Sequence, residues 1–275
     1  MTVSTILLAL GAGVLIWLGM MLRQIRLMQK SGYLPWRRYL TGMLAWRALI
    51  PVLAHLFVGP VYVRGRENFE KVKGRKVLIP NHTFQLDFNI AAMASKLHFY
   101  YLTATTELRG IQGWIGARTQ AIPVNTSVPH GGADAVEACV RALSRRRSAS
   151  LLIYPQGGLK AQWPLSKEEF KNGAVRIAQS VREKTGEEVW VFPMGTCYLR
   201  EPEQAPKTVQ GKLVRRCRKM FGKTNYGALV YVGEPIAIST LPADADAAIE
   251  VVFKAIEKLV AQAMGEAEAM RTKRD

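Results

Sequence analysis

The sequence predicts an α/β protein in which helices cover a sheet and a helical N-terminus attaches to the membrane. Short apolar runs alternate along the chain with stretches of helical periodicity, a pattern typical of a sheet packed between helices. The chain has 275 residues, and 49% of them are hydrophobic. One domain of about 200 residues therefore has ample core, and the remainder fits a membrane attachment better than a second domain.

The N-terminal stretch TVSTILLALGAGVLIWLGMML, residues 2–22, carries no charged side chain. At about 1.5 Å per residue, a helix of this length crosses roughly 30 Å of hydrocarbon. Arg23, Arg26 and Lys30 follow the apolar run, which favours a membrane helix over a secretory signal peptide. The positive-inside rule then keeps the rest of the chain on the cytoplasmic side. We expect a membrane helix at residues 1–30, with a buried or interfacial hairpin helix as the alternative.

Residues 31–60 mix aromatic and aliphatic side chains with arginines, among them Trp36, Trp46, Arg37 and Arg47. Tryptophan and arginine favour the headgroup level of a bilayer while an aliphatic face dips below it. We expect an amphipathic interfacial helical segment here. A core helix that covers the folded domain is the alternative.

The α/β domain is expected to occupy residues 61–275. Apolar runs predict strands at 61–65, 76–80, 99–104, 120–125, 149–155, 189–198 and 228–236. Three- and four-residue spacing of apolar side chains predicts helices at 88–97, 131–146, 167–184 and 244–270. The basic segment 201–225 is either an inserted helix on the membrane side or a solvated loop.

Charge and cysteine content restrict the partners. Lys and Arg outnumber Asp and Glu by 38 to 21, for a formal net charge of +17. We expect an anionic membrane surface as a partner and no nucleic acid, because no nucleic-acid recognition module is visible. Cys139, Cys197 and Cys217 form no CxxC pair and lie far from any histidine at metal-ligand spacing. This predicts reduced thiols and no metal.

One histidine and one aspartate stand five positions apart in VLIPNHTFQLDF. On one continuous helix, His82 and Asp87 would point roughly 140° apart and would not meet. At a turn between a strand ending near residue 80 and a helix starting near residue 88, the two side chains can converge. Asn81 or Thr83 would then cap the helix.

Further motifs follow this pair in order: TELRGIQGWIGARTQAIPVN, IYPQGG, EEFKNGAVRIA, VWVFPMG and YVGEPI. An H-x-x-x-x-D match alone is weak, but with these neighbours the chain resembles the glycerolipid acyltransferases over about residues 60–260. Among these enzymes, it resembles the 1-acylglycerol-3-phosphate (lysophosphatidic acid) acyltransferase family. The resemblance implies an α/β domain with a membrane-docking helical N-terminus.

The resemblance also implies transfer of a fatty acyl group from a thioester to a hydroxyl of a membrane lipid acceptor. Acyl-CoA or acyl carrier protein would be the co-substrate, with no cofactor and no metal. His82 would be the general base, and Asp87 would keep the His82 imidazole in the required tautomer. Backbone N–H groups at the helix start would stabilise the oxyanion. The implied substrate-binding residues are Asn81, Tyr154, Pro155, Gln156, Gly157, Gly158, Lys160 and Lys171.

Departures from the family pattern fall in the blocks that handle the acceptor. The chain has YPQGGL at 154–159 where the family has Phe-Pro-Glu-Gly-Thr-Arg, so the acid and the arginine are missing. Asn125 or Thr126 replaces a second arginine, and Thr106 replaces a lysine. Arginine forms bidentate hydrogen bonds to phosphate that these side chains cannot supply.

Two interpretations stay open at this point. In one, the acceptor is a neutral or hydroxyl-rich lipid that Gln156 hydrogen-bonds. In the other, the acceptor is still lysophosphatidic acid, and Lys160, Arg118 or Arg109 rebuilds the phosphate site. A catalytically silent lipid-binding protein is the alternative outside enzymes, and the intact pair His82 and Asp87 argues against it.

Overall fold

The structure is a computed structural model that describes residues 58–84, 86–108, 116, 120–125, 131–200 and 227–272. The expected membrane helix at 1–30, most of the expected interfacial segment at 31–60 and the basic segment at 201–225 lie outside these residues. Within the described ranges, no helix has the length and apolar character needed to cross a membrane.

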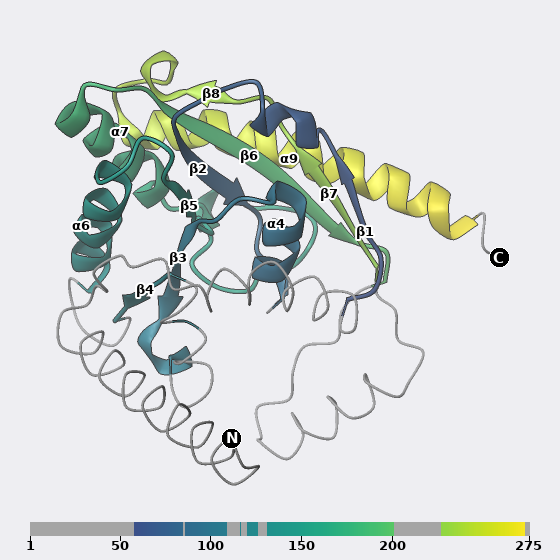
Figure 1. The fold of residues 1–275 in the computed structure, drawn as a ribbon. Coiled ribbons are helices and arrows are strands. Elements are labelled where there is room, and N and C mark those ends of the chain that lie inside the picture. Colours follow the sequence, from purple (N-terminus) through teal and green to yellow (C-terminus); the bar gives the residue numbers. More distant parts are fainter. Residues whose placement is uncertain are drawn as a thin grey trace, which may run out of the picture.

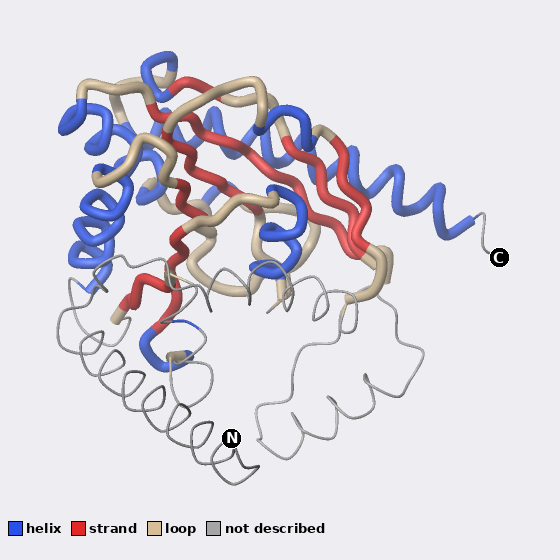
Figure 2. Tube along the Cα trace, viewed as in Figure 1, coloured by secondary structure: helices blue, strands red, loops and turns tan. Residues whose placement is uncertain are grey.

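A mixed eight-stranded sheet forms the centre of the fold (Figures 1 and 2). Its main path runs in the order β1-β7-β6-β2-β5-β3-β4, and β8 pairs with β6. Pairing is parallel except where β6 meets β7 and β8. The strands are β1 (Val61–Arg64), β2 (Arg75–Pro80), β3 (Tyr100–Ala104), β4 (Ala121–Val124), β5 (Ser150–Leu152), β6 (Val189–Tyr198), β7 (Ala228–Val232) and β8 (Ile236–Ala237).

Helices cover both faces of this sheet, as the α/β prediction requires. They are α4 (Asp87–Ser95), α6 (Gly131–Ser144), α7 (Gly173–Thr185) and α9 (Ala245–Thr272). Val77 and Ile79 of β2 pack in one core cluster with residues of α6, α7 and α9. Leu78, between them, packs in a second cluster with α4. This alternation follows from the two-residue period of a strand, and the predicted α/β arrangement of a sheet covered by helices is confirmed.

Two expected elements differ in the structure. The run at 228–236 is not one strand, because the chain turns at Gly233 and β8 then pairs with the amino-terminal part of β6. The expected helix at 167–184 starts late. A 3-10 turn occupies Lys167–Glu169, and α7 begins only at Gly173. Between them the backbone N–H of Lys171 donates to the carbonyl of Pro155 at 3.0 Å, so this segment is tied to the loop after β5.

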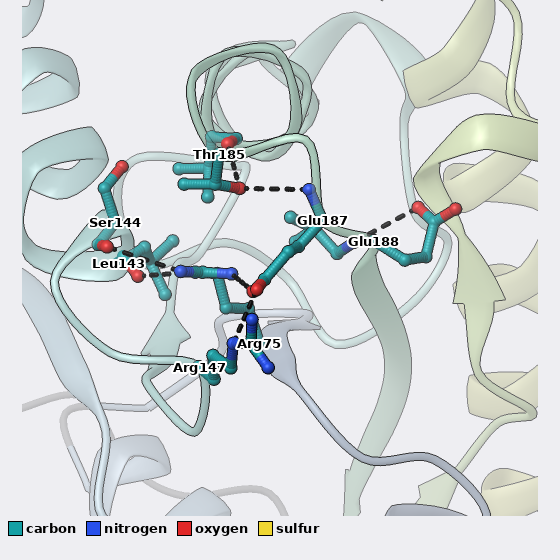
Figure 3. A network of polar contacts seen from close by, with 9 residues as sticks. Arg75, Leu143, Ser144, Arg147, Thr185, Glu187 and Glu188 are labelled. Atoms are coloured by element: carbon teal, nitrogen blue, oxygen red, sulfur yellow. Dashed lines mark hydrogen bonds and ion pairs between the residues drawn. The ribbon is translucent and has the colours of Figure 1, made fainter.

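A buried arginine ties three elements together at the amino end of β2 (Figure 3). The side chain of Arg75 is only 5% exposed and pairs with Glu187, in the loop between α7 and β6. Its Nε donates to the carbonyl of Leu143 at 2.8 Å and its Nη2 to that of Ser144 at 3.3 Å. These carbonyls belong to the last turn of α6, where intrahelical donors are missing. Arg75 therefore fixes α6 against the sheet at the edge opposite to the carboxyl end of β2.

Candidate active site

Three neighbouring strands bring the candidate residues to one edge of the sheet. β6, β2 and β5 lie side by side and run parallel, so their carboxyl ends meet at the same edge. His82 follows β2 by two residues, Tyr154 follows β5 by two residues, and Tyr198 is the last residue of β6. In open α/β sheets this edge is where ligands bind.

His82 and Asp87 meet across the turn from β2 to α4, as the sequence predicted. The His82 Nδ1 and Asp87 Oδ2 atoms are 3.0 Å apart. A carboxylate accepts hydrogen bonds and cannot donate them, so this contact assigns the hydrogen to Nδ1 and leaves a lone pair on Nε2. The His82 side chain is 20% exposed, whereas that of Asp87 is 2% exposed. A reactant can therefore approach the imidazole but not the carboxylate.

Asp87 is held by the loop that precedes its own helix. Its Oδ2 accepts the backbone N–H groups of Thr83 at 2.7 Å and Phe84 at 2.9 Å. Its Oδ1 accepts the hydroxyl of Tyr198. Hydrogen bonds to a charged group are stronger than those between neutral groups, and together these bonds fix the buried carboxylate of Asp87.

One expectation about this turn is wrong. Neither Asn81 nor Thr83 caps α4: the N-cap position is Leu86, with no side-chain cap. The amides of Thr83 and Phe84 donate to Asp87. The physical reason is that Asp87, the first residue of the helix, turns back onto the loop and takes up these donors itself.

Asn81 instead joins the loop to β6. Its Nδ2 donates to the carbonyl of Thr196 at 3.0 Å, and its Oδ1 accepts the Thr196 N–H at 2.7 Å. These two hydrogen bonds resemble those of a further residue pair in the parallel ladder between β2 and β6. Asn81 is fully buried, and both polar atoms of its side chain are used in these two hydrogen bonds.

The segment after β5 packs directly on the imidazole. The Tyr154 ring stacks on the His82 ring, with centroids 4.0 Å apart and planes inclined by 21°. The Oε1 of Gln156 accepts the backbone N–H of His82 at 2.6 Å. Burial, followed by the negative charge of Asp87, raises the pKa of Tyr154 well above its usual value, so its hydroxyl stays a neutral donor near pH 7.

Three buried polar atoms around His82 are unpaired within the described residues. They are the hydroxyl oxygens of Thr83 and Tyr154 and the Nε2 of Gln156. A buried polar atom without a partner costs free energy, so native structures contain few of them. All three belong to residues next to the His82 imidazole, and each atom is covered by protein in this structure.

The remaining predicted residues lie along the same segment. Gly157 has a φ of +66°, which favours glycine, and a Cβ there would lie 3.2 Å from the Lys171 Nζ. A Cβ at Gly158 would meet nothing within 4 Å. The Lys160 N–H donates to the His82 carbonyl at 2.9 Å, while its Nζ pairs with Glu169 at 2.9 Å. The structure thus brings together all eight predicted substrate-binding residues and the pair, whereas Arg109 and Arg118 lie outside the described residues.

Sequence reasoning missed Tyr198 and Gln162. The N–H of Tyr198 donates to the Oε1 of Gln162 at 2.9 Å, and the Gln162 Nε2 lies 3.2 Å from the Cys197 Sγ. Tyr198 ends an apolar strand, so its pattern indicates core packing alone. Its hydroxyl was the available signal, because a buried tyrosine usually needs a hydrogen-bond partner.

Apart from His82 and Asp87, the cysteines and carboxylates in the described part of the chain form no metal centre. No group of three or more His, Cys, Asp or Glu side chains there has the geometry to hold an ion. Burial raises the pKa of the Cys197 thiol to about 11. Cys197 is therefore a protonated core residue and not a nucleophile.

Comparisons with known proteins bear on the family and on the fold. The model of the family described as "Acyltransferase" matches residues 60–196. The crystal structure of the 1-acyl-sn-glycerophosphate (LPA) acyltransferase PlsC from Thermotoga maritima is similar to this chain, with a TM-score of 0.55 and 15% sequence identity. The match covers 90% of this chain and 88% of that chain. A comparison with curated proteins gave no match. The resemblance predicted from the ordered motifs is confirmed, and at this identity the structural likeness establishes the fold.

Proposed function

We propose that this glycerolipid acyltransferase-like protein moves a fatty acyl group from an acyl thioester to a hydroxyl of a lipid acceptor, with His82 and Asp87 as a catalytic pair. The observation that carries the proposal is the 3.0 Å contact between His82 Nδ1 and Asp87 Oδ2, inside the region that matches the acyltransferase family. Because the buried carboxylate holds Nδ1, the Nε2 of this partly exposed imidazole is left as the base.

The reaction follows from this tautomer. Nε2 takes the proton of the acceptor hydroxyl as the oxygen attacks the thioester carbonyl carbon. The tetrahedral oxyanion collapses, the C–S bond breaks, and the leaving thiolate takes the proton back from the imidazolium. The products are an ester and a free thiol. Asp87 stabilises the imidazolium between these two steps, as the carboxylate does in a serine hydrolase triad.

The donor and the location belong to the same proposal. Acyl-CoA and acyl carrier protein are both acidic, and a net charge of +17 suits either of them as well as an anionic membrane surface. The uncharged stretch at residues 2–22 supports attachment to the membrane, with the catalytic domain on the cytoplasmic side. Its placement is tested by protease protection in sealed vesicles.

The acceptor is best assigned as a lipid whose hydroxyl lies at His82 and whose headgroup reaches Gln156. The unpaired Nε2 of Gln156 offers a hydrogen-bond donor where the family pattern has an acid. Lys160, one candidate for a rebuilt phosphate site, is already paired with Glu169. Both features support a non-phosphate acceptor, such as a glycolipid or another lyso-lipid, over lysophosphatidic acid.

The test is thiol release from long-chain acyl-CoA, and from acyl carrier protein, by the purified protein in lipid nanodiscs. Lysophosphatidic acid, other lysophospholipids and glycolipids serve as acceptors, with glycerol 3-phosphate as competitor. His82→Ala is expected to lower the rate by at least about 100-fold, the usual contribution of a general base. His98→Ala is the matched control and is expected to remain active.

Each outcome has a definite meaning. Release that depends on His82 and on one acceptor establishes the reaction and its substrate class. Strong inhibition by glycerol 3-phosphate would overturn the non-phosphate acceptor. If no thiol is released with any acceptor and either donor, the protein is a catalytically silent lipid-binding protein and not an enzyme.

A further inference from the structure

We infer that Tyr198 is a positioning residue for the catalytic carboxylate, because its hydroxyl fixes the rotation of Asp87 and, through Asp87, the imidazole of His82. The inference rests on the proposed function and adds a third residue to it. Tyr198 comes from the end of β6, more than a hundred residues away from the pair along the chain. It lies beyond residues 60–196, the part that matches the acyltransferase family.

The two oxygens of Asp87 have different surroundings. Oδ2 accepts three hydrogen bonds, from His82 Nδ1 and from the amides of Thr83 and Phe84. Oδ1 accepts the hydroxyl of Tyr198, its only donor among the residues that the structure describes. A carboxylate turns about its Cβ–Cγ bond, and a donor on each oxygen is what prevents that turn. Tyr198 therefore keeps Oδ2 directed at the imidazole.

Tyr198 is itself locked from three directions. Its N–H donates to Gln162 Oε1 at 2.9 Å, in the loop after β5. Its carbonyl accepts from Arg271 Nη2 at 3.2 Å, at the end of α9. Its ring packs edge-to-face on Phe84, with centroids 5.6 Å apart and an interplanar angle of 82°. A fully buried side chain held in this way has one orientation.

The chemistry of the hydroxyl suits this role. Burial, the charge of Asp87 and the hydrogen bond to Asp87 all raise the pKa of Tyr198 well above its usual value, in that order of size. The hydroxyl therefore remains a donor across the working range of pH. Without it, Oδ1 is a buried carboxylate oxygen with no donor, and the carboxylate gains freedom to rotate away from His82.

The experiment compares Tyr198→Phe with Tyr231→Phe in the full-length protein in nanodiscs, using the acceptor that supports His82-dependent release. Tyr231 is a matched control, because its hydroxyl also contacts a carboxylate, that of Glu266 on α9. Tyr198→Phe is expected to lower kcat by about tenfold or more while KM stays unchanged, since it removes one hydrogen bond to a charged group. Tyr231→Phe is expected to keep kcat.

A spectroscopic readout separates positioning from loss of stability. In ¹⁵N-histidine spectra, the His82 signal is assigned by its loss in His82→Ala, and the two neutral tautomers are distinguished by their nitrogen shifts. Wild type is expected to show one tautomer, with the hydrogen on Nδ1, and Tyr198→Phe a mixture. Gln162→Met is the second variant should Tyr198→Phe fail to fold, and it is expected to lower kcat with the same KM.

An unchanged kcat and a single tautomer in folded Tyr198→Phe, or in folded Gln162→Met should Tyr198→Phe not fold, would overturn the inference. A loss of kcat that Tyr231→Phe shares would also overturn it, because both variants would then act through stability. Failure of the proposed function looks different: wild type itself would then show no release that depends on His82.

Discussion

Gln156→Glu is the substitution that tests how the proposed site recognises its acceptor. The Oε1 of Gln156 is fixed by the His82 N–H at 2.6 Å, and its buried amide nitrogen is the polar atom left without a partner in the described residues. Glutamate keeps the anchoring oxygen and the shape of the side chain. It replaces the buried N–H donor with an acceptor and adds a negative charge, and in doing so it restores the acid that the acyltransferase pattern has at this position.

The size of the effect identifies the contact. If Nε2 donates to a neutral oxygen of the acceptor, the lost hydrogen bond contributes about 0.5–1.5 kcal/mol, a two- to tenfold fall in kcat/KM. If Nε2 donates to the tetrahedral oxyanion, the loss is about 100- to 1000-fold in kcat. We expect the smaller effect, confined to the preferred acceptor, because the proposed role of Gln156 is headgroup recognition.

The assay is thiol release at varied acceptor concentration, so that kcat and KM are obtained separately. Gln162→Glu is the matched control: it makes the same chemical change on a glutamine whose Oε1 is anchored on the Tyr198 N–H at 2.9 Å. It is expected to leave acceptor preference unchanged, because its amide nitrogen contacts Cys197 and not the site.

Equal rates for Gln156→Glu and wild type with every acceptor would refute the reasoning, since the donor would then contact nothing in the reaction. A fall of about 100-fold in kcat that is the same for all acceptors would show that Gln156 stabilises the oxyanion and does not recognise the headgroup. A gain of activity on lysophosphatidic acid would show that the restored acid suffices for the family's acceptor.

Three further predictions concern stability. Arg75→Met is expected to lower the free energy of unfolding by about 3 kcal/mol, measured by urea unfolding, because it leaves two helix carbonyls without their buried donor and leaves Glu187 with only the exposed Arg147 as ion-pair partner in the described residues. Gly195→Ala is expected to cost about 3 kcal/mol in the same assay, since its Cβ would lie 2.6 Å from the backbone of Leu259 and Val260. The raised pKa of Tyr154 means that the folded state keeps a proton that the unfolded state releases above about pH 10, so stability falls as pH rises beyond that value. Tyr154→Phe is expected to reduce this fall by about 1 kcal/mol between pH 10 and 11.

The fold was predictable because local patterns and burial agree over most of the described chain. The expected run at 189–198 is β6 to the residue, and the helix expected at 88–97 begins one residue earlier. The late start of α7 was not predictable, since the residues before Gly173 have helical periodicity. A long-range bond from Lys171 to Pro155 outweighs that local preference.

The contact between His82 and Asp87 was predictable from their spacing, whereas the contacts that support this pair were not. A five-residue interval at a strand-to-helix turn limits where His82 and Asp87 can meet. Nothing local signals that Asn81 bonds to Thr196, or that Tyr198 reaches Asp87, because each contact spans more than a hundred residues of sequence. Such contacts depend on which strands become neighbours, and the parallel pairing of β2 with β6 decides both of them.

The arrangement of charge near the site bears on the acceptor. The Lys160 ammonium is 2.9 Å from Glu169, so a phosphate would have to compete with an existing partner. Lys171 has no carboxylate within ion-pair distance in the described ranges, and its ammonium lies over Gly157, where a side chain would crowd it. A phosphate-bearing acceptor would thus meet Lys171 as a point charge, without the planar fork that an arginine supplies. A neutral headgroup needs only the donor on Gln156 and leaves Lys171 hydrated at no cost. For this reason the competition with glycerol 3-phosphate, and not a survey of acyl chains, is the measurement that separates the two acceptors.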